Sequence, residues 1–334
     1  MKILSKQKLT AAFDQLAEKA ELLVPMQKGA TSAFLPWPEF EPGRDELRLE
    51  ALNVDKPPKD AVLPQTERMY KFSANGPEVA VQEVYEISSP RIVFGIRPCD
   101  FRGIECLDQV FLTRGYADGF YQSRRDNTVF IAQACYQPGP NCFCNAMGVD
   151  PVKPQADVTI HDLGDGYAWE PLTPKGEETT EVISDLLQEK KAELPEVKPF
   201  TRQVAYAGLA EKLKDLFEHP IWEKLSDPCQ NCGICTYSCP TCYCFDIQVK
   251  SFGEAGYRFR CWDSCMYREY TLMAGGHNPR EASRERFRNR FLHKLQFFQE
   301  RYGQPLCIGC GRCLIVCPAG ISIVNIMQEL KEVE

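Results

Sequence analysis

Apolar and polar positions in the first half of the chain form short runs separated by turn-forming residues, a pattern that predicts strands. The runs are ELLVPM, TSAFLPW, EVAVQEVYEI, RIVFGI and TVFIAQA. DFRGIECLDQVF, residues 100–111, follows one of these strands and predicts a helix, so this half has α/β character. The run DVTIHDLGDGYAWEPL predicts a hairpin that turns at residues 164–166.

Helical periodicity marks the start of the chain and most of its last third. MKILSKQKLTAAFDQLAEKA predicts an amphipathic helix, and LAEKLKDLFEHPIWEKL predicts another. Between the halves, PKGEETTEVISDLLQEKKAELPEV is acidic and bounded by prolines, which is typical of a partly helical surface linker. The expected fold class is α+β, with an α/β-type domain at 1–175, an acidic linker at 176–205 and a largely helical domain at 206–334.

Composition narrows the classes of function. The 334 residues are 44% hydrophobic, enough for real cores, and the net charge of -7 lacks the basic excess that nucleic acid demands. The N-terminus has no unbroken apolar core of a secretion signal, and no window approaches 18 consecutive apolar residues. We therefore expect a soluble cytoplasmic protein with no membrane contact. Metal binding explains its 17 cysteines better than disulfides do.

Two stretches repeat one cysteine rhythm, CQNCGICTYSCP at 229–240 and CIGCGRCLIVCP at 307–318. C-x2-C-x2-C-x3-C-P is the bacterial pattern for paired [4Fe-4S] clusters, in which the fourth cysteine of each stretch binds the other cluster. The 206–334 domain is therefore expected to carry a dicluster ferredoxin-like module. Cluster one is assigned to Cys229, Cys232, Cys235 and Cys317, and cluster two to Cys307, Cys310, Cys313 and Cys239. Glycines in the two loops let backbone N–H groups approach the sulfurs: Gly233, Gly309 and Gly311.

Two other interpretations of these cysteines are weaker. Zinc ribbons separate two C-x2-C pairs by a dozen or more residues, and neither stretch does so. Cys235, Cys239 and Cys242 also match the C-x3-C-x2-C triad of radical S-adenosylmethionine enzymes, but that triad overlaps the ferredoxin pattern.

A second group of cysteines lies in the N-terminal half. Cys99 and Cys135 each end a run that predicts a strand, where open α/β sheets place their ligands, and NCFC adds Cys142 and Cys144 on a nearby loop. These four could hold a third [4Fe-4S] cluster, with zinc or simple burial of small side chains as alternatives. Cys106 is interpreted as a core residue, and Asp100 is expected to cap the helix.

Further cysteines and a basic segment lie between the two repeats. Cys242, Cys244, Cys261 and Cys265 could contribute a further cluster, an alternative ligand choice, or only thiols packed around the iron sites. Residues 280–301 carry seven basic side chains, which predict a solvated helix face or, beside anionic clusters, a means to raise their reduction potentials or to dock an acidic partner. The histidines, at 161, 219, 277 and 293, show no metal-ligand spacing.

Several substrate-binding motifs are absent. The chain contains no G-x-G-x-x-G, P-loop or G-x-S-x-G, so we expect no flavin or nucleotide of its own and no catalytic residues of those classes. The pattern favours a protein that conducts electrons between partners.

A set of motifs makes a family resemblance specific. In order over residues 85–325, they are RPCDFRGIECLDQVFL, CYQPGPNCFCNAMG, CPTCYCFD, WDSC, GGHNPR, RFRNRFLHK and CIGCGRC. The chain resembles the iron-sulfur beta subunit of cytoplasmic sulfhydrogenases and the similar A subunit of anaerobic sulfite reductases. The first 80 residues carry no matched motif.

That resemblance implies a heteromeric complex. A flavin-containing subunit would oxidise NAD(P)H, this subunit would relay electrons, and a NiFe hydrogenase or siroheme sulfite reductase subunit would be the terminal reductase. The implied cluster cysteines add Cys242, Cys244 and Cys265 to the twelve assigned above, whereas Cys106 and Cys261 lie outside the family pattern. A self-contained reductase with a catalytic cluster and an iron-sulfur scaffold without redox activity remain as alternatives.

Overall fold

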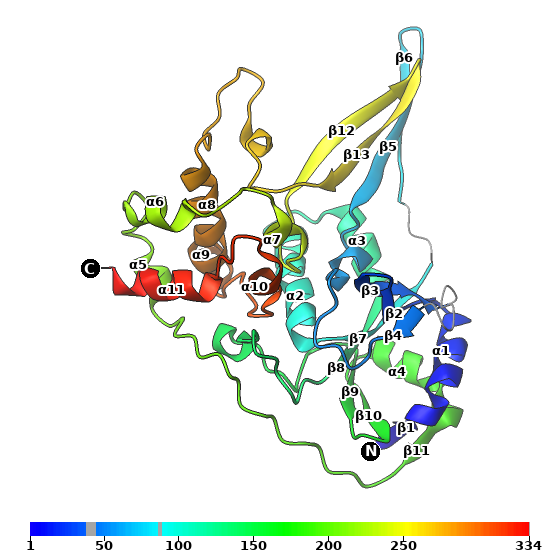
Figure 1. Ribbon diagram of the computed structural model, residues 1–334. Coiled ribbons are helices and arrows are strands. Elements are labelled where there is room, and N and C mark those ends of the chain that lie inside the picture. Colours follow the sequence, from blue (N-terminus) through cyan, green and yellow to red (C-terminus); the bar gives the residue numbers. More distant parts are fainter. Residues whose placement is uncertain (38–44, 86–88, 334) are drawn as a thin grey trace.

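The computed structural model describes residues 1–37, 45–85 and 89–333, and its largest element is a nine-stranded sheet (Figure 1). The strand order is β11-β1-β10-β9-β8-β7-β2-β3, with β4 paired to β2. The neighbours β2, β7, β8 and β9 run parallel, and the other pairs are antiparallel. The strands are β1 (Lys2–Ser5), β2 (Glu21–Lys28), β3 (Thr31–Pro36), β4 (Asp45–Leu47), β7 (Arg91–Ile96), β8 (Thr128–Gln133), β9 (Val158–Asp162), β10 (Gly166–Pro171) and β11 (Leu187–Glu189).

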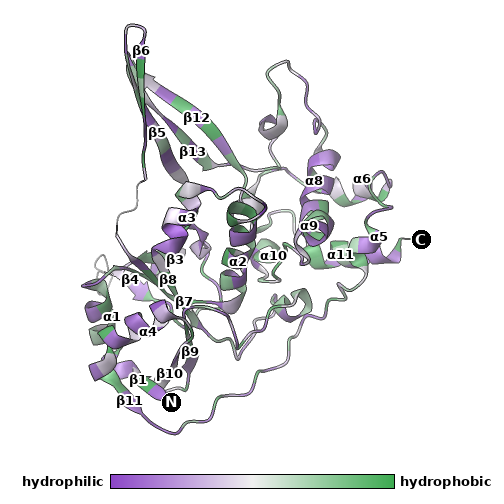
Figure 2. Cartoon of the chain, turned by 180° about the vertical axis from the view of Figure 1, so that it is seen from behind, coloured by the Kyte–Doolittle hydropathy of each residue, from purple (hydrophilic) through white to green (hydrophobic). Residues whose placement is uncertain are grey.

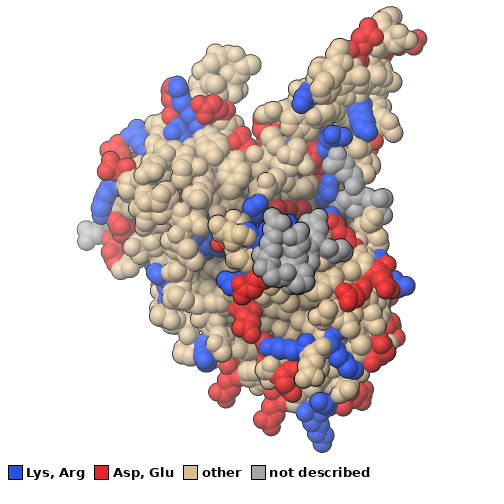
Figure 3. Space-filling model, turned by 45° about the vertical axis from the view of Figure 1, so that its right-hand side comes forward, with Lys and Arg blue, Asp and Glu red and all other residues tan. Residues whose placement is uncertain are grey.

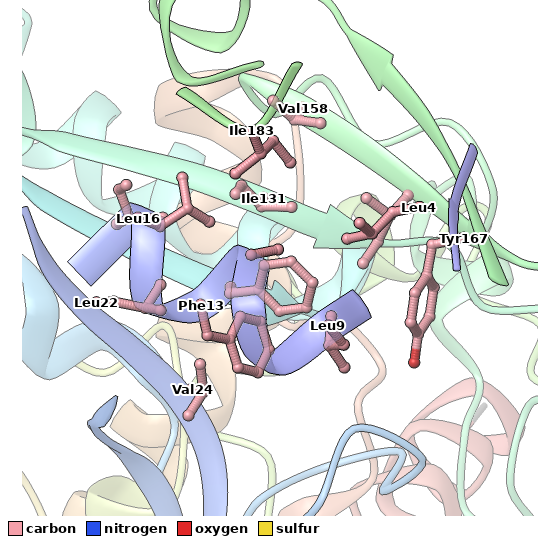
Figure 4. Packing of buried hydrophobic residues seen from close by; sticks show 14 of the residues in the cluster. Leu4, Leu9, Phe13, Leu16, Leu22, Val24, Ile131, Val158, Tyr167 and Ile183 are labelled. Carbon is pink, nitrogen blue, oxygen red and sulfur yellow. The ribbon is translucent and has the colours of Figure 1, made fainter. Parts of the chain in front are cut away.

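Helices cover both faces of this sheet. On one face, α1 (Leu9–Ala17) packs Phe13 against Phe94 of β7, next to α4 (Pro174–Val182) (Figure 4). On the other face, α2 (Pro98–Leu112) and α3 (Gly119–Asp126) pack against Val93 and Phe130. The central parallel strands are buried on both sides, which explains why their sequences are nearly continuous apolar runs.

A second, four-stranded sheet projects from the body as an arm (Figure 1). It joins β5 (Thr66–Asn75) and β6 (Glu78–Glu83) to β12 (Phe245–Phe252) and β13 (Ala255–Trp262) in the antiparallel order β12-β13-β5-β6. Hydrophobic and hydrophilic residues are interspersed along its strands (Figure 2). The arm therefore combines segments from both halves of the chain.

A buried ion-pair network fixes the base of the arm. The carboxylate of Glu67 on β5 accepts from Arg124 of α3 at 2.7 Å and from Arg260 of β13 at 2.6 Å. Arg260 also donates to Asp118 at 2.7 Å. Each guanidinium in this network has a carboxylate partner, as buried charges require.

Short helices make up most of the C-terminal part. A π-helical turn, His293–Phe297, joins α8 to α9 in one continuous helical segment. The helices are α5 (Leu209–Lys212), α6 (Ile221–Ser226), α7 (Ile234–Tyr237), α8 (Ser283–Leu292), α9 (Phe298–Tyr302), α10 (Arg312–Val316) and α11 (Ile323–Glu332). Short 3-10 turns lie at Lys6–Lys8, Pro58–Ala61, Cys144–Met147, Ser184–Leu186 and Glu269–Thr271.

The structure confirms the α+β fold class and the hairpin at 164–166, where β9 meets β10. The predicted N-terminal helix is wrong for the first residues, because β1 pairs with β10 and buries Leu4 completely. Within the segment predicted as a linker, β11 joins the sheet beside β1, and residues 190–206 contain no helix or strand and run along the outside of the molecule (Figure 1). No helix in the described ranges is long and apolar enough to cross a membrane.

Candidate metal centres

Five cysteines line one cavity beside α7 and α10. Cys229, Cys232 and Cys235 come from the stretch that leads into α7, and Cys317 directly follows α10; Cys313 borders the same cavity. Burial raises the pKa of the Cys229 thiol, and negative charge on Cys235 and Cys317 raises it further. The structure therefore brings together the four residues assigned to cluster one.

The other three cysteines of the second set, Cys307, Cys310 and Cys313, lie near Cys239, which is just past α7. Burial raises the pKa of Cys307, Cys310 and Cys313, that of Cys307 to about 12, and negative charge on Cys239 raises each further. The fourth cysteine of each stretch thus lies near the first three of the other, a placement compatible with the crossed assignment. Ligation of iron by these eight residues stays a prediction.

The four N-terminal cysteines line a separate cavity, together with Cys310. Cys99 lies in the first turn of α2, Cys135 lies two residues beyond β8, and Cys142 and Cys144 lie on the following loop. Burial raises the pKa of Cys144 to about 12, and negative charge on Cys142 and Cys135 contributes to the shift. The chain folds these thiols into one place, and their binding of a third cluster stays a prediction.

Asp100 does not have the role predicted for it. The residue before α2 is Arg97, with no side-chain cap, and the Asp100 carboxylate instead accepts a hydrogen bond from Arg312 at 2.8 Å. Both side chains are buried. The Asp100 carboxylate thus pairs with Arg312 instead of capping the helix, and this ion pair links α2 to α10.

The N-terminal cavity and the second cysteine stretch are in direct backbone contact. The Phe143 N–H donates to the Gly309 carbonyl at 2.9 Å. Gly309 and Gly311 have φ values of 67° and 78°, and a β-carbon on either would meet backbone atoms of residues 141–144 within 2.6 Å. Gly309 and Gly311 therefore have a second role besides the predicted one near the sulfurs. They let the loop at residues 141–144 approach closely, because only a residue without a side chain leaves enough space.

The remaining cysteines separate into two kinds. The neighbouring Cys242 holds the pKa of Cys239 well below its usual value, and the neighbouring Cys265 lowers the pKa of Cys244 to about 6. Cys106 is fully buried in α2, in keeping with the predicted core role. Cys261 lies on β13. Neither Cys106 nor Cys261 lines the cavities described above.

Buried cations surround the thiols. Lys59, Lys294 and Arg290 are 2%, 3% and 4% exposed, and none of the three forms an ion pair with a carboxylate in the described part of the chain. The Lys294 ammonium lies 3.3 Å from the Cys239 sulfur and 3.0 Å from the Thr241 hydroxyl. Burial alone would lower the pKa of Lys294, but negative charge on Cys239 and Cys242 raises it above its usual value. Such cations fit anionic clusters at the thiols, because a buried charge without a counter-charge is costly.

The basic segment at residues 280–301 is only partly exposed, although one interpretation of its sequence predicts a solvated helix face. Arg286, Arg290 and Lys294 are buried, whereas Arg284 and Arg301 are exposed. The three buried residues stand four apart and therefore share one side of the helix, a signal that was present in the sequence. Lys59, in the run KPPKDA, carried no comparable signal.

A site for a single metal ion needs its ligands closer together than a [4Fe-4S] cluster does. Within residues 1–37, 45–85 and 89–333, no group of three or more His, Cys, Asp or Glu side chains is placed to hold one metal ion. Ligands of one zinc ion stand only about 3.8 Å apart, since each Zn–S bond is about 2.3 Å. A cubane is held differently, because each of its thiolates binds a separate iron.

Comparison with known proteins places the chain in a family. Residues 228–321 match the family described as a 4Fe-4S dicluster domain. The chain is 32% identical over 334 aligned residues to the beta subunit of sulfhydrogenase 2 from Pyrococcus furiosus, an alignment that covers 96% of this chain and 95% of the relative.

Charged side chains on the face drawn in Figure 3 are mixed in sign rather than gathered into one basic patch.

Gly309→Ala is expected to lower the free energy of unfolding by about 2–5 kcal/mol, because a left-handed backbone costs about 1–2 kcal/mol and overpacking a further 1–3 kcal/mol. Gly303→Ala is the matched control: its φ is 77°, but no atom lies within 4 Å of the added carbon. It should cost only about 1–2 kcal/mol. Chemical denaturation under anaerobic conditions measures both, and equal losses would mean that the close approach at Gly309 is not tight.

Proposed function

The chain belongs to the family of sulfhydrogenase beta subunits, and we propose that it is the electron-relaying iron-sulfur subunit of a heteromeric oxidoreductase complex. In this proposal it receives electrons from a flavin-containing subunit that oxidises NAD(P)H and passes them to a terminal reductase, either a hydrogenase and sulfur reductase or a sulfite reductase. The dicluster domain and the relative's name as a subunit support the coarser statement that it transfers electrons within a complex. The finer roles of the partners come from the family resemblance.

Three thiol sites in a row are the observation that carries this proposal. Cys313 of the second site borders the cavity of the first, and Cys310 of the second site borders the cavity of the N-terminal four. The second site therefore lies between the other two, with cysteines that reach both neighbours. We assign a [4Fe-4S] cluster to each site, since such a cluster accepts and donates one electron at a time.

Both ends of this row approach the surface. Cys232 of the first site is exposed. Cys135 of the N-terminal site borders an open cleft of about 630 Å³ that Lys6, Gln133 and Tyr136 also line. In the middle site Cys310 is buried, and Cys239, Cys307 and Cys313 are partly buried. Accessible thiols at both ends suit a relay between two partners.

The buried cations set the electrostatics of the relay. Lys294 lies against Cys239 of the middle site, and negative charge on Cys235 and Cys313 raises the pKa of Arg290 against the lowering effect of burial. Arg290 also lines the cavity of the first site, which Cys313 of the middle site borders. Positive charge next to a cluster favours its reduced, more negative form and raises its reduction potential.

Cys142→Ala is expected to remove the N-terminal cluster, because this thiol lines the cavity with Cys99, Cys135 and Cys144. Anaerobically purified variant protein should contain about four irons fewer than the unaltered protein. Cys106→Ala is the control, since it deletes a buried thiol from the helix that carries Cys99 but outside the cavity. Unchanged iron content in Cys142→Ala would reject the third cluster.

The isolated chain should accept electrons from dithionite but catalyse no reduction of sulfite, polysulfide or protons. A relay lacks a substrate site and turns over only when its partner subunits are added. Visible absorption follows cluster reduction, and product analysis follows turnover. Steady product formation by the chain alone would overturn the relay and support a self-contained reductase, whereas clusters that dithionite and voltammetry leave unchanged would support a scaffold.

A further inference from the structure

Strand β12 is one open edge of the projecting arm (Figure 1). It pairs with β13 along all eight of its residues, and within the described residues no strand pairs with its other side. Its register with β13 is regular throughout, and its sequence FDIQVKSF contains no proline. Bulges and prolines are common means of protecting such an edge from another chain. The outer edge of β12 is therefore available to a further strand.

The side chains of β12 divide into an apolar set and a charged set on opposite faces of the arm. Ile247 and Val249 are 39% and 58% exposed, and they share one face because they stand two residues apart. Asp246, Gln248 and Lys250 are exposed on the other face.

The two charged residues of β12 have no charged partner in the described part of the chain, since neither Asp246 nor Lys250 forms an ion pair there. The Asp246 carboxylate accepts hydrogen bonds from the Ile247 N–H at 2.8 Å and the Gln248 side chain at 2.9 Å, both within β12. The Lys250 ammonium lies 5.3 Å from the centre of the Phe252 ring. Both charges can therefore pair with a group on another chain.

The order of these side chains is complementary to itself in the antiparallel direction. When two copies of β12 run antiparallel with Gln248 opposite its own counterpart, each Asp246 lies opposite Lys250. Each Ile247 then lies opposite Val249 on the other face of the joined sheet. Residues directly opposite each other have β-carbons about 4.5–5.5 Å apart, so both the ion pairs and the apolar pairs are in contact.

We propose that two copies of this chain associate through antiparallel pairing of their β12 strands about a twofold axis at Gln248. The two arms thereby form one continuous sheet. A twofold axis uses the same surface on both copies, so the two open β12 edges cover each other and the assembly is closed. A single pair of edge strands is a small interface, so the association is reversible and depends on protein concentration. The proposal concerns contact between copies and does not depend on the relay of electrons.

The opposite edge of the arm offers a competing arrangement. Strand β6 is exposed along its whole length, and against β12 of a second copy it would place Glu78 opposite Lys250 and Val79 opposite Val249. That contact uses a different surface on each copy and would continue into an open filament. It gives one ion pair at each contact, whereas the twofold arrangement gives two. The charge pattern therefore favours pairing of β12 with itself.

The test uses the full chain with its clusters, purified without oxygen, and measures its mass by sedimentation velocity over a range of concentrations. The unaltered protein should shift from monomer to dimer as concentration rises. Asp246→Lys places a lysine opposite Lys250, and Lys250→Asp places an aspartate opposite Asp246, at both ends of the contact. Each variant alone should raise the dissociation constant about tenfold or more, because like charges directly opposite on neighbouring strands repel.

A mixture of these two variants tests the register itself. Each copy of one variant supplies the charge that the other lacks, so equal amounts of Asp246→Lys and Lys250→Asp should restore the dimer. Misfolding of either variant could not produce this recovery. Iron content is measured on the same samples and should equal that of the unaltered protein.

Glu78→Lys is the matched control on the opposite edge. It should leave the dimer unchanged, whereas it would weaken a contact between β12 and β6. Monomer at every concentration, as expected if a different subunit covers β12 instead, overturns the inference. So does dimer that persists in both single variants, dimer that fails to return in their mixture, or dimer that is lost in Glu78→Lys. Electron relay is scored separately by reduction with dithionite, so its failure is distinguishable from failure of the dimer.

Discussion

Buried positive charge opposite buried thiols is the interaction on which the rest of this structure depends. Lys294 and Arg290 lie within the protein without carboxylate partners in the described residues, and an ion removed from water costs several kcal/mol unless a counter-charge is near. Negatively charged thiolates next to these cations supply it, and the proposed clusters would hold such thiolates. We therefore expect cluster binding and folding to be coupled, as in other proteins whose metal sites do not exist in the unfolded chain.

Crossed pairing and backbone contact unite parts that are distant in the sequence. Cys317 lines the cavity of the first stretch, and Cys239 lies near the cysteines of the second, which is the arrangement that the proposed crossed ligation needs. The Asp100–Arg312 ion pair and the approach of Gly309 to residue 144 then hold the α/β part against the second stretch. The sheet matters to function because it fixes Cys99 and Cys135 at the end of parallel strands, next to Cys310.

Local sequence was sufficient for much of this account. The cysteine rhythm indicated both C-terminal sites, and two apolar runs ending in cysteine indicated the N-terminal group, because spacing and strand direction are local properties. The arm could not be found in this way. Its strands β5 and β13 lie far apart in the chain, and their pairing places Arg260 opposite Glu67, a contact that no local pattern encodes.

The errors have similar causes. Asp100 has the residue type of a helix cap, but its carboxylate pairs with an arginine more than two hundred residues away. The first residues of the chain suit a helix, yet strand pairing in the large sheet outweighs that propensity. Lys59 is an ordinary charged residue in sequence, and only the fold reveals that it is buried beside Cys242. By contrast, the four-residue spacing of Arg286, Arg290 and Lys294 was readable in advance.

Diffraction at the iron absorption edge from crystals grown without oxygen tests the central claim most directly. The account predicts iron peaks enclosed by Cys229, Cys232, Cys235 and Cys317 and by Cys239, Cys307, Cys310 and Cys313, with the Lys294 ammonium beside the second. Absence of iron at these thiols, or iron that joins Cys239 to Cys229, Cys232 and Cys235, would contradict it.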